Sequence, residues 1–143
     1  MKVDHVANIR AFNRFYTRVL GLLDKHILNS QYTLPEVRIL YELATNENLT
    51  ASDLIETLHI DKGYLSRIIL DLRTKRLVQS KRSDRDGRSL VLNLTKIGQR
   101  EFRILNKASD LQLASIVEKL TNAERNKLVR NMNEIVGLLS KTQ

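Results

Sequence analysis

Apolar residues recur at intervals of three and four through the first part of the chain, the spacing that places them on one face of an α-helix. The pattern predicts a helix over residues 3–28. Phe12, Phe15 and Tyr16 widen its apolar stripe, so that apolar side chains fall on two sides of the helix. A lone domain gives a first helix only one core, and the second apolar side therefore predicts a core shared with another subunit.

Capping residues mark where three further helices begin. Thr33 and Glu36 stand at the spacing of a capping box, and Thr50 and Asp61 each precede a new run of helically spaced apolar residues. Only residues 59–61 separate the second of these helices from the third. Two short helices joined by a three-residue connector are typical of a helix-turn-helix motif.

The helix that follows Asp61 has two faces of different character. Its predicted core face carries Leu65, Ile68, Ile69 and Leu72. Its opposite face carries Gly63, Ser66, Arg67, Leu70 and Thr74. The second face is not needed for the core, and we expect it to be available to a partner.

Alternating apolar residues predict two strands after this helix, at residues 77–82 and 90–94. The charged segment between them contains an Asp-Gly pair, which favours the turn of a β-hairpin. A helix-turn-helix followed by a hairpin is a winged helix. Two long helices, capped by Thr95 and Thr121, complete the chain. The predicted fold class is therefore mainly α (α+β), with a winged helix-turn-helix.

Basic residues are concentrated in the predicted helix-turn-helix and hairpin. The 143-residue chain has a formal net charge of +8, and residues 61–88 contain nine basic and four acidic residues, a net charge of +5. This balance predicts a polyanionic partner, and charge alone leaves nucleic acid and an anionic membrane as alternatives. A basic surface on one helix and one hairpin is typical of proteins that bind duplex DNA.

Several classes of chemistry find no support in the sequence. The chain has no cysteine, which excludes disulfides, thiol nucleophiles and cysteine zinc sites. Its three histidines lack metal-ligand spacing, and no phosphate-binding Gly-Lys loop or nucleophile elbow is present. We therefore expect no enzyme activity, no cofactor and no metal. No apolar run approaches the roughly 18 residues of a membrane span, and no signal-peptide core is found, so a cytoplasmic protein without a membrane partner is expected.

The helix-turn-helix and hairpin residues resemble those of the MarR family of bacterial transcription regulators. Two positions depart from the family pattern. Arg76 replaces a glycine that would adopt a left-handed backbone at low cost, and Leu70 replaces a residue that is more often polar. The resemblance covers nearly the whole chain and is most specific at residues 63–69, 73–78, 83–88 and 92–98.

This resemblance implies a single MarR-type domain over residues 1–143 that forms an obligate homodimer. The winged helix-turn-helix lobe would occupy about residues 33–95, and helices at about 3–28 and 96–141 would form the dimerisation body. Double-stranded DNA of pseudo-palindromic sequence is the implied partner. A small-molecule effector, bound in the crevice between body and lobe, is a further partner that the family allows.

The candidate DNA-binding residues lie on the predicted helix-turn-helix and hairpin, namely Thr50, Ser52, Lys62, Gly63, Tyr64, Ser66, Arg67, Lys81, Arg82, Arg85 and Arg88. The N-terminal end of the second helix would enter the major groove. There Arg67 can bind guanine bidentately, or it can hold a phosphate or an internal carboxylate. Gly63 permits close backbone approach or merely fills the first turn, and Tyr64 can stack, donate to phosphate or pack.

The hairpin tip has two interpretations. Arg85 and Arg88 would enter the minor groove, where narrow A·T-rich segments attract arginine, or they would pair with Asp84 or Asp86 in a solvated loop. The two are compatible, because one aspartate can hold an arginine in position.

The other candidates are placed to meet the DNA backbone. Thr50 and Ser52, at a helix N-terminus, either contact phosphate or serve only as caps. Lys81 and Arg82 on the first hairpin strand are expected to face the backbone, and several phosphate contacts would make affinity fall steeply with salt.

Three functions follow from these features. The first is a sequence-specific, homodimeric DNA-binding regulator, for example a repressor. The second is a non-specific architectural DNA binder that uses the same basic surface. The third arises because residues 9–23 are similar to the opening of two-part proteins that join a MarR module to a GNAT acetyltransferase. In that case this chain is either the regulatory half or a stand-alone relative, since it contains no acetyl-CoA-binding loop.

Overall fold

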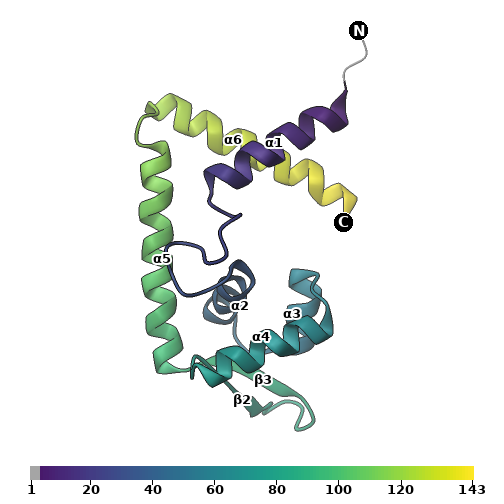
Figure 1. The fold of residues 1–143 in the computed structure, drawn as a ribbon. Coiled ribbons are helices and arrows are strands. Elements are labelled where there is room, and N and C mark those ends of the chain that lie inside the picture. The colour runs from purple at the N-terminus through teal and green to yellow at the C-terminus, as the bar shows by residue number, and fades with distance from the viewer. Residues whose placement is uncertain (1–3) are drawn as a thin grey trace. The chain divides into compact units, whose positions relative to one another are not determined.

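A computed structural model describes residues 4–143, which form two compact units, the first ending at Ala108 and the second beginning at Ser109. The long helix α5 crosses this boundary. The fold is mainly helical with one small sheet, as predicted (Figure 1). The elements in chain order are α1 (His5–Val19), α2 (Leu34–Thr45), β1 (Leu49–Thr50), α3 (Ala51–Leu58), α4 (Lys62–Thr74), β2 (Val78–Arg82), β3 (Leu90–Leu94), α5 (Lys96–Val117), α6 (Asn122–Leu139) and the short 3-10 helix η1 (Ser140–Thr142).

The first unit contains the predicted winged helix-turn-helix. Helices α3 and α4 are its two helices, and β2 and β3 pair antiparallel in a register that places Val78 opposite Leu94. The strand β1 adds to the other edge of β3, with Leu49 opposite Leu92, so that the order is β1-β3-β2. This third strand was not predicted, because it has only two residues and its second residue, Thr50, is also the cap of α3.

The alternation predicted for the last strand holds only in part. Val91, Leu92 and Leu94 are all buried, whereas Leu90 at the start of β3 is exposed. Successive side chains of a strand point to opposite faces, so the burial of both Val91 and Leu92 shows that β3 is covered on both faces at this point.

The predicted helix caps are confirmed. Capping boxes begin at Thr33, Thr50 and Thr121, where each hydroxyl accepts the backbone N–H three residues on and the side chain there accepts the N–H of the cap. Asp61 accepts the Tyr64 N–H at 3.0 Å. Each such cap is worth about 1 kcal/mol. The local sequence therefore fixes where α3 and α4 begin.

The core of the first unit fixes the rotation of α4 about its axis. The predicted core face of this helix is buried: Leu65, Ile68, Ile69 and Leu72. They belong to one cluster with residues of α2, α3, the sheet and α5, including Ile39, Leu40, Leu54, Leu77, Leu92, Leu94 and Leu105. With four side chains anchored in this cluster, the opposite face of α4 is held toward solvent.

Helix α4 ends in a Schellman motif whose left-handed residue is Arg76, with φ 60°. The Leu77 N–H donates to the Leu72 carbonyl at 2.9 Å, and the Arg76 N–H donates to the Arg73 carbonyl at 2.8 Å. Leu72 and Leu77 are both buried, which gives the apolar contact that accompanies this motif. The chain thus keeps the backbone geometry of a helix end that favours glycine, with an arginine in that place.

The first helix is shorter than predicted. The apolar pattern predicted a helix over residues 3–28, whereas α1 ends at Val19. The predicted start at Val3 lies outside the described residues. Gly21, with φ 66°, ends α1 through the same pair of hydrogen bonds that ends α4, here 3.0 and 3.1 Å long. Residues 20–31 form turns and bends, so the prediction was wrong over its last nine residues, 20–28.

The apolar faces of α1 are not buried within this chain. Phe12 and Phe15 are 46% and 56% exposed, and α1 has no buried residue. The Phe12 ring stacks on the Tyr16 ring with centroids 5.4 Å apart. Burial on two sides is therefore not found within the first unit, and a core shared with a second subunit stays a prediction.

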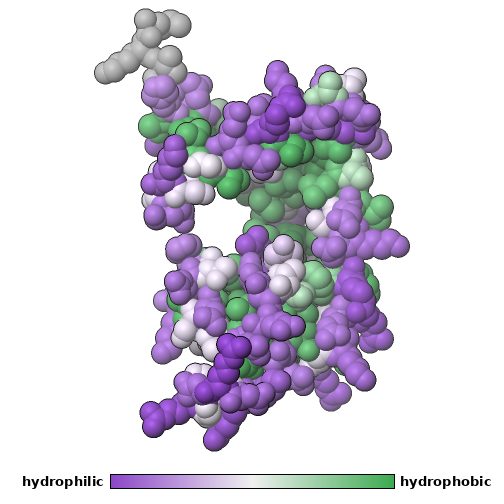
Figure 2. All heavy atoms as spheres, turned by 180° about the vertical axis from the view of Figure 1, so that it is seen from behind, coloured by the Kyte–Doolittle hydropathy of each residue, from purple (hydrophilic) through white to green (hydrophobic). Residues whose placement is uncertain are grey.

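The second unit consists of the end of α5 and the helices α6 and η1. Arg125 joins the two long helices, because its Nε and Nη2 donate to the Val117 and Glu118 carbonyls at 3.0 Å each. Large apolar side chains remain exposed on both helices, among them Leu111, Leu113, Val129, Val136 and Leu138. Figure 2 shows wide green areas of apolar surface between the purple hydrophilic ones.

Candidate nucleic-acid interface

The N-terminal end of α4 presents an exposed polar surface. The candidates of this helix, Lys62, Gly63, Tyr64, Ser66 and Arg67, are all exposed, as the helical spacing predicted. They share the first two turns of α4, directly after the Asp61 cap. The structure thus brings these five predicted residues together on one face.

Arg67 folds back toward the start of the helix. Its guanidinium carbon lies 5.8 Å from the centroid of the Tyr64 ring, in cation–π contact. A Cβ on Gly63 would lie 3.7 Å from Arg67 Nη1 and 3.2 Å from Asp61 Oδ2. Glycine at position 63 therefore leaves room for the capping carboxylate, a role that the sequence did not reveal. Within residues 4–143 the ion pairs are Arg38–Glu42 and Lys75–Glu36, so Arg67 is not bound to an internal carboxylate.

The start of α3 carries two further candidates. The Thr50 hydroxyl donates to Asp53 Oδ2 at 2.9 Å and accepts the Asp53 N–H at 3.3 Å, so it serves as a cap. Ser52 is exposed in the first turn of the same helix. Of the two, Ser52 has the side chain that is better placed for a phosphate at this helix N-terminus.

The hairpin between β2 and β3 projects four cationic candidates. Lys81 and Arg82 are exposed on β2, and Arg85 and Arg88 are exposed in the loop that follows. The loop is held by Asp86, which accepts the Arg88 N–H at 3.0 Å and the Ser89 hydroxyl at 3.1 Å. In the described chain, Asp86 therefore organises the backbone of the loop rather than neutralising its arginine side chains.

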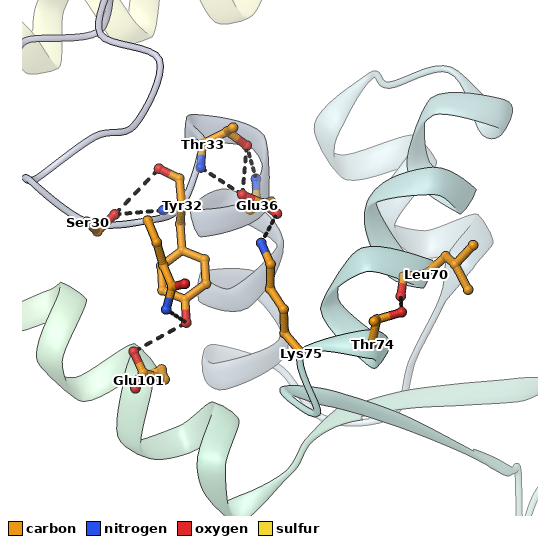
Figure 3. A network of polar contacts seen from close by, with 9 residues as sticks. Ser30, Tyr32, Thr33, Glu36, Leu70, Thr74, Lys75 and Glu101 are labelled. Atoms are coloured by element: carbon orange, nitrogen blue, oxygen red, sulfur yellow. Dashed lines mark hydrogen bonds and ion pairs between the residues drawn. The ribbon is translucent and has the colours of Figure 1, made fainter.

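Two contacts of α4 tie it to its surroundings, and neither was predicted. Arg73 Nη2 donates to the Ser80 hydroxyl at 2.6 Å, which links α4 to the hairpin strand β2. Lys75 at the end of α4 pairs with Glu36 of α2 at 3.0 Å and lies 5.3 Å from the Tyr32 ring centroid (Figure 3). Lys75 and Glu36 are 39 positions apart, so their pairing leaves no local signal in the sequence.

Glu36 lies at the centre of a polar network that Figure 3 shows from close by. Its carboxylate accepts the Thr33 N–H at 2.8 Å in addition to Lys75. Burial alone would raise the pKa of Glu36, but the Thr33 N–H and the Lys75 ammonium together lower it below its ordinary value. Glu36 is thus a buried carboxylate that is held in its charged form.

Tyr32 extends this network to α5. Its hydroxyl donates to Glu101 Oε2 at 3.3 Å, and its side chain is 3% exposed. Burial, together with the neighbouring Glu101 carboxylate, raises the pKa of Tyr32. The network thus connects the loop before α2 with the ends of α4 and α5, the elements that hold the winged lobe together.

The described residues show no group of three or more His, Asp or Glu side chains that could hold a metal ion. Among the same residues, no helix is long and apolar enough to cross a membrane. What this structure does present is a helix-turn-helix whose second helix and hairpin carry exposed cations, which defines a winged-helix protein.

Comparison with known proteins finds a family model that matches part of the chain. Residues 30–89 match the model of the MarR family. The organic hydroperoxide resistance transcriptional regulator of Bacillus subtilis (strain 168) is 36% identical over 77 residues, or 54% of this chain and 50% of the relative. The chain thus matches about half the length of this curated relative.

Solved structures share the fold over nearly the full length. Streptococcus pneumoniae FabT in complex with DNA matches with a TM-score of 0.81 at 17% identity, over 98% of this chain and 100% of that chain. Wild-type MarR of E. coli, in its apo form, matches with a TM-score of 0.74 at 18% identity, over 94% and 98%. At these identities the likeness establishes the fold alone.

Proposed function

We propose that this protein is a sequence-specific transcriptional regulator that binds double-stranded DNA as a homodimer on a pseudo-palindromic site. The observation that carries the proposal is the exposed N-terminal face of α4, where Lys62, Ser66 and Arg67 point away from a buried anchor of leucines and isoleucines. A helix held in this way can enter a major groove with its cations toward the base edges.

The hairpin supplies the second part of the proposed interface. Arg73 and Ser80 connect α4 to β2, so the helix and the hairpin are held in one lobe. With α4 in a major groove, Arg85 and Arg88 would enter the adjacent minor groove, and Lys81 and Arg82 would follow the phosphate backbone. Such contacts add affinity that depends steeply on salt.

The homodimer is proposed from the apolar surface that one chain leaves uncovered. Val6, Ile9, Phe12 and Phe15 of α1 are each at least 46% exposed, and α6 carries further exposed apolar side chains. Apolar patches of this kind mark protein–protein interfaces in soluble proteins. We assign dimerisation to α1 and to the helices over residues 96–141, the winged lobe to residues 33–95, and one MarR-type domain to the whole chain.

The names of the relatives support a regulator without identifying its signal. The Bacillus subtilis relative is named for organic hydroperoxide resistance. This chain has no cysteine, so it has no thiol that a hydroperoxide could oxidise to a sulfenic acid.

A small-molecule effector is the alternative regulatory signal. A cavity of about 310 Å³ beside Tyr32 and Glu101 has room for such a molecule. The acetyltransferase hypothesis stays a prediction.

Selection of bound sites from random duplexes tests the proposal. The affinity for the selected site is then compared with that for a scrambled duplex of the same composition at physiological salt. A regulator should prefer its selected site by a factor of roughly 1,000 or more. Equal affinity for the two duplexes would contradict sequence-specific binding and favour the architectural alternative.

A further inference from the structure

The outward face of α4 becomes apolar beyond Arg67. Leu70 is 63% exposed, although it lies in the middle of the helix that the lobe presents. The two hydroxyls on either side of it are turned into the helix. Ser66 Oγ donates to the Lys62 carbonyl at 2.9 Å. Thr74 Oγ1 donates to the Leu70 carbonyl, also at 2.9 Å (Figure 3). The two hydroxyls that flank Leu70 are therefore used within α4, and Leu70 is an exposed apolar group between them.

Leu70 lines a small apolar depression between α4 and the hairpin. Leu90 at the start of β3 is 53% exposed and lines the same cavity of about 360 Å³. Arg73 also lines it, and Arg82 lies opposite Leu90 in the β2–β3 pairing. The depression is thus bordered by cations and belongs to the same lobe surface as the proposed DNA contacts.

The positive charge around this depression indicates what kind of partner would contact it. Residues 61–88 carry a net charge of +5, which favours a polyanion over an apolar protein surface. In the major groove of a polyanionic duplex, the edges of the bases offer hydrogen-bonding groups and a single apolar group, the C5-methyl of thymine. Leu70 has no hydrogen-bonding atom in its side chain, so this methyl is the base-edge group that it can recognise.

We propose that Leu70 is a specificity-determining residue that contacts the C5-methyl of a thymine in each half of the binding site. The proposal rests on the proposed function, because it requires α4 to lie in a major groove. It assigns a role to a leucine whose exposure the stability of the lobe does not explain. It also predicts that the preferred site contains a thymine that is recognised through its methyl group rather than through hydrogen bonds.

The test replaces each thymine of the selected duplex in turn by deoxyuridine, which removes only the C5-methyl. At one position in each half-site, wild-type protein should lose about fourfold in affinity, the value of one buried methyl-sized group. Leu70→Asn should bind the thymine and deoxyuridine duplexes equally at that position. Leu23→Asn, which changes a leucine that is 79% exposed outside the lobe surface, should keep the wild-type dependence.

The outcomes separate the two proposals. A selected site with no deoxyuridine effect at any thymine would overturn the role of Leu70 and leave the regulator function standing. A deoxyuridine effect of the same size in wild-type and Leu70→Asn protein would overturn it as well, since another residue would then contact the methyl. Failure to select any preferred site would overturn both.

Discussion

The carbonyl oxygen of Leu77 occupies the space that a Cβ atom on Gly98 would need. Thr95 holds the segment at Leu77 against the first turn of α5. Its hydroxyl donates to the Arg76 carbonyl at 2.6 Å and accepts the Gly98 N–H at 3.0 Å. Its own N–H donates to the Leu77 carbonyl at 3.0 Å. The end of α4, the start of β2 and the first turn of α5 are thereby fixed at one point.

Gly98→Ala should destabilise the protein, because the new methyl group would collide with backbone rather than with a side chain that can move. We expect a loss of about 3 kcal/mol, at the upper end of overpacking effects. Gly87→Ala is the matched control, since nothing lies within 4 Å of a Cβ at that position. Chemical denaturation measures both variants, and equal unfolding midpoints for the two would contradict this account of the junction.

Arg76→Gly should have the opposite effect. Arg76 adopts φ 60°, a conformation that glycine reaches without strain from a Cβ atom. The gain should be about 0.5–1 kcal/mol, because the greater freedom of glycine in the unfolded chain offsets part of the relieved strain. Arg76→Ala removes the same side chain but keeps the Cβ, so it should not stabilise. If alanine stabilises as much as glycine does, the benefit comes from lost charge and not from the backbone.

Much of the fold could be predicted from local signals. The caps at Thr33, Thr50, Asp61 and Thr121 and the helical spacing within α4 are read from residues close together in the sequence, and the structure confirms them. The end of α1 was missed although Gly21 marks it, because apolar residues beyond the glycine continued the helical pattern by chance.

The candidate site was predictable only as far as local periodicity reaches. Helical spacing alone shows that Ser66 and Arg67 point outward. It does not show that the Arg67 guanidinium lies over Tyr64, or that Lys75 pairs with Glu36 across 39 positions. Those relationships depend on how α2 and α4 pack, which is decided by the whole core.

The Glu36–Lys75 pair should make stability depend on pH in a defined direction. The pKa of Glu36 is lowered in the folded state, so the charged carboxylate stabilises the protein above its ordinary pKa of 4.5. This contribution is lost as the pH falls below 4.5 and through the folded-state pKa. Wild-type protein should therefore lose more stability between pH 7 and pH 3 than Glu36→Gln does.

Glu36→Gln should also cost about 2 kcal/mol at pH 7, because charged hydrogen bonds to Thr33 and Lys75 are weakened. Glu56→Gln serves as the control, since Glu56 is exposed on α3 and should keep the wild-type pH dependence. The free energy of unfolding, measured by denaturant titration at each pH, tests both. Parallel pH curves for wild type and Glu36→Gln would show that the pair does not contribute.

The homodimer prediction can be tested without DNA. Sedimentation of the wild type at micromolar concentration should give a mass near twice 16.5 kDa. Ile9→Glu combined with Phe12→Glu places two charges on the exposed apolar face of α1, and it should give a folded monomer because neither residue is buried in the chain. Leu70→Glu adds a charge to an exposed leucine of α4 and should leave the dimer intact. A wild-type protein that sediments as a monomer would exclude the proposed dimer.

The two arginines of the hairpin loop provide the most direct test of whether the hairpin binds DNA. Replacing Arg85 and Arg88 by alanine should weaken binding to the selected duplex by more than about tenfold, or roughly 1.4 kcal/mol. The loop should keep its shape, because Asp86 bonds the backbone N–H of residue 88 and not a guanidinium. Arg100→Ala with Arg103→Ala removes the same charge from the exposed surface of α5 and should weaken binding far less. Equal losses for the two pairs would mean that overall charge, and not a minor-groove contact, accounts for the contribution of the hairpin.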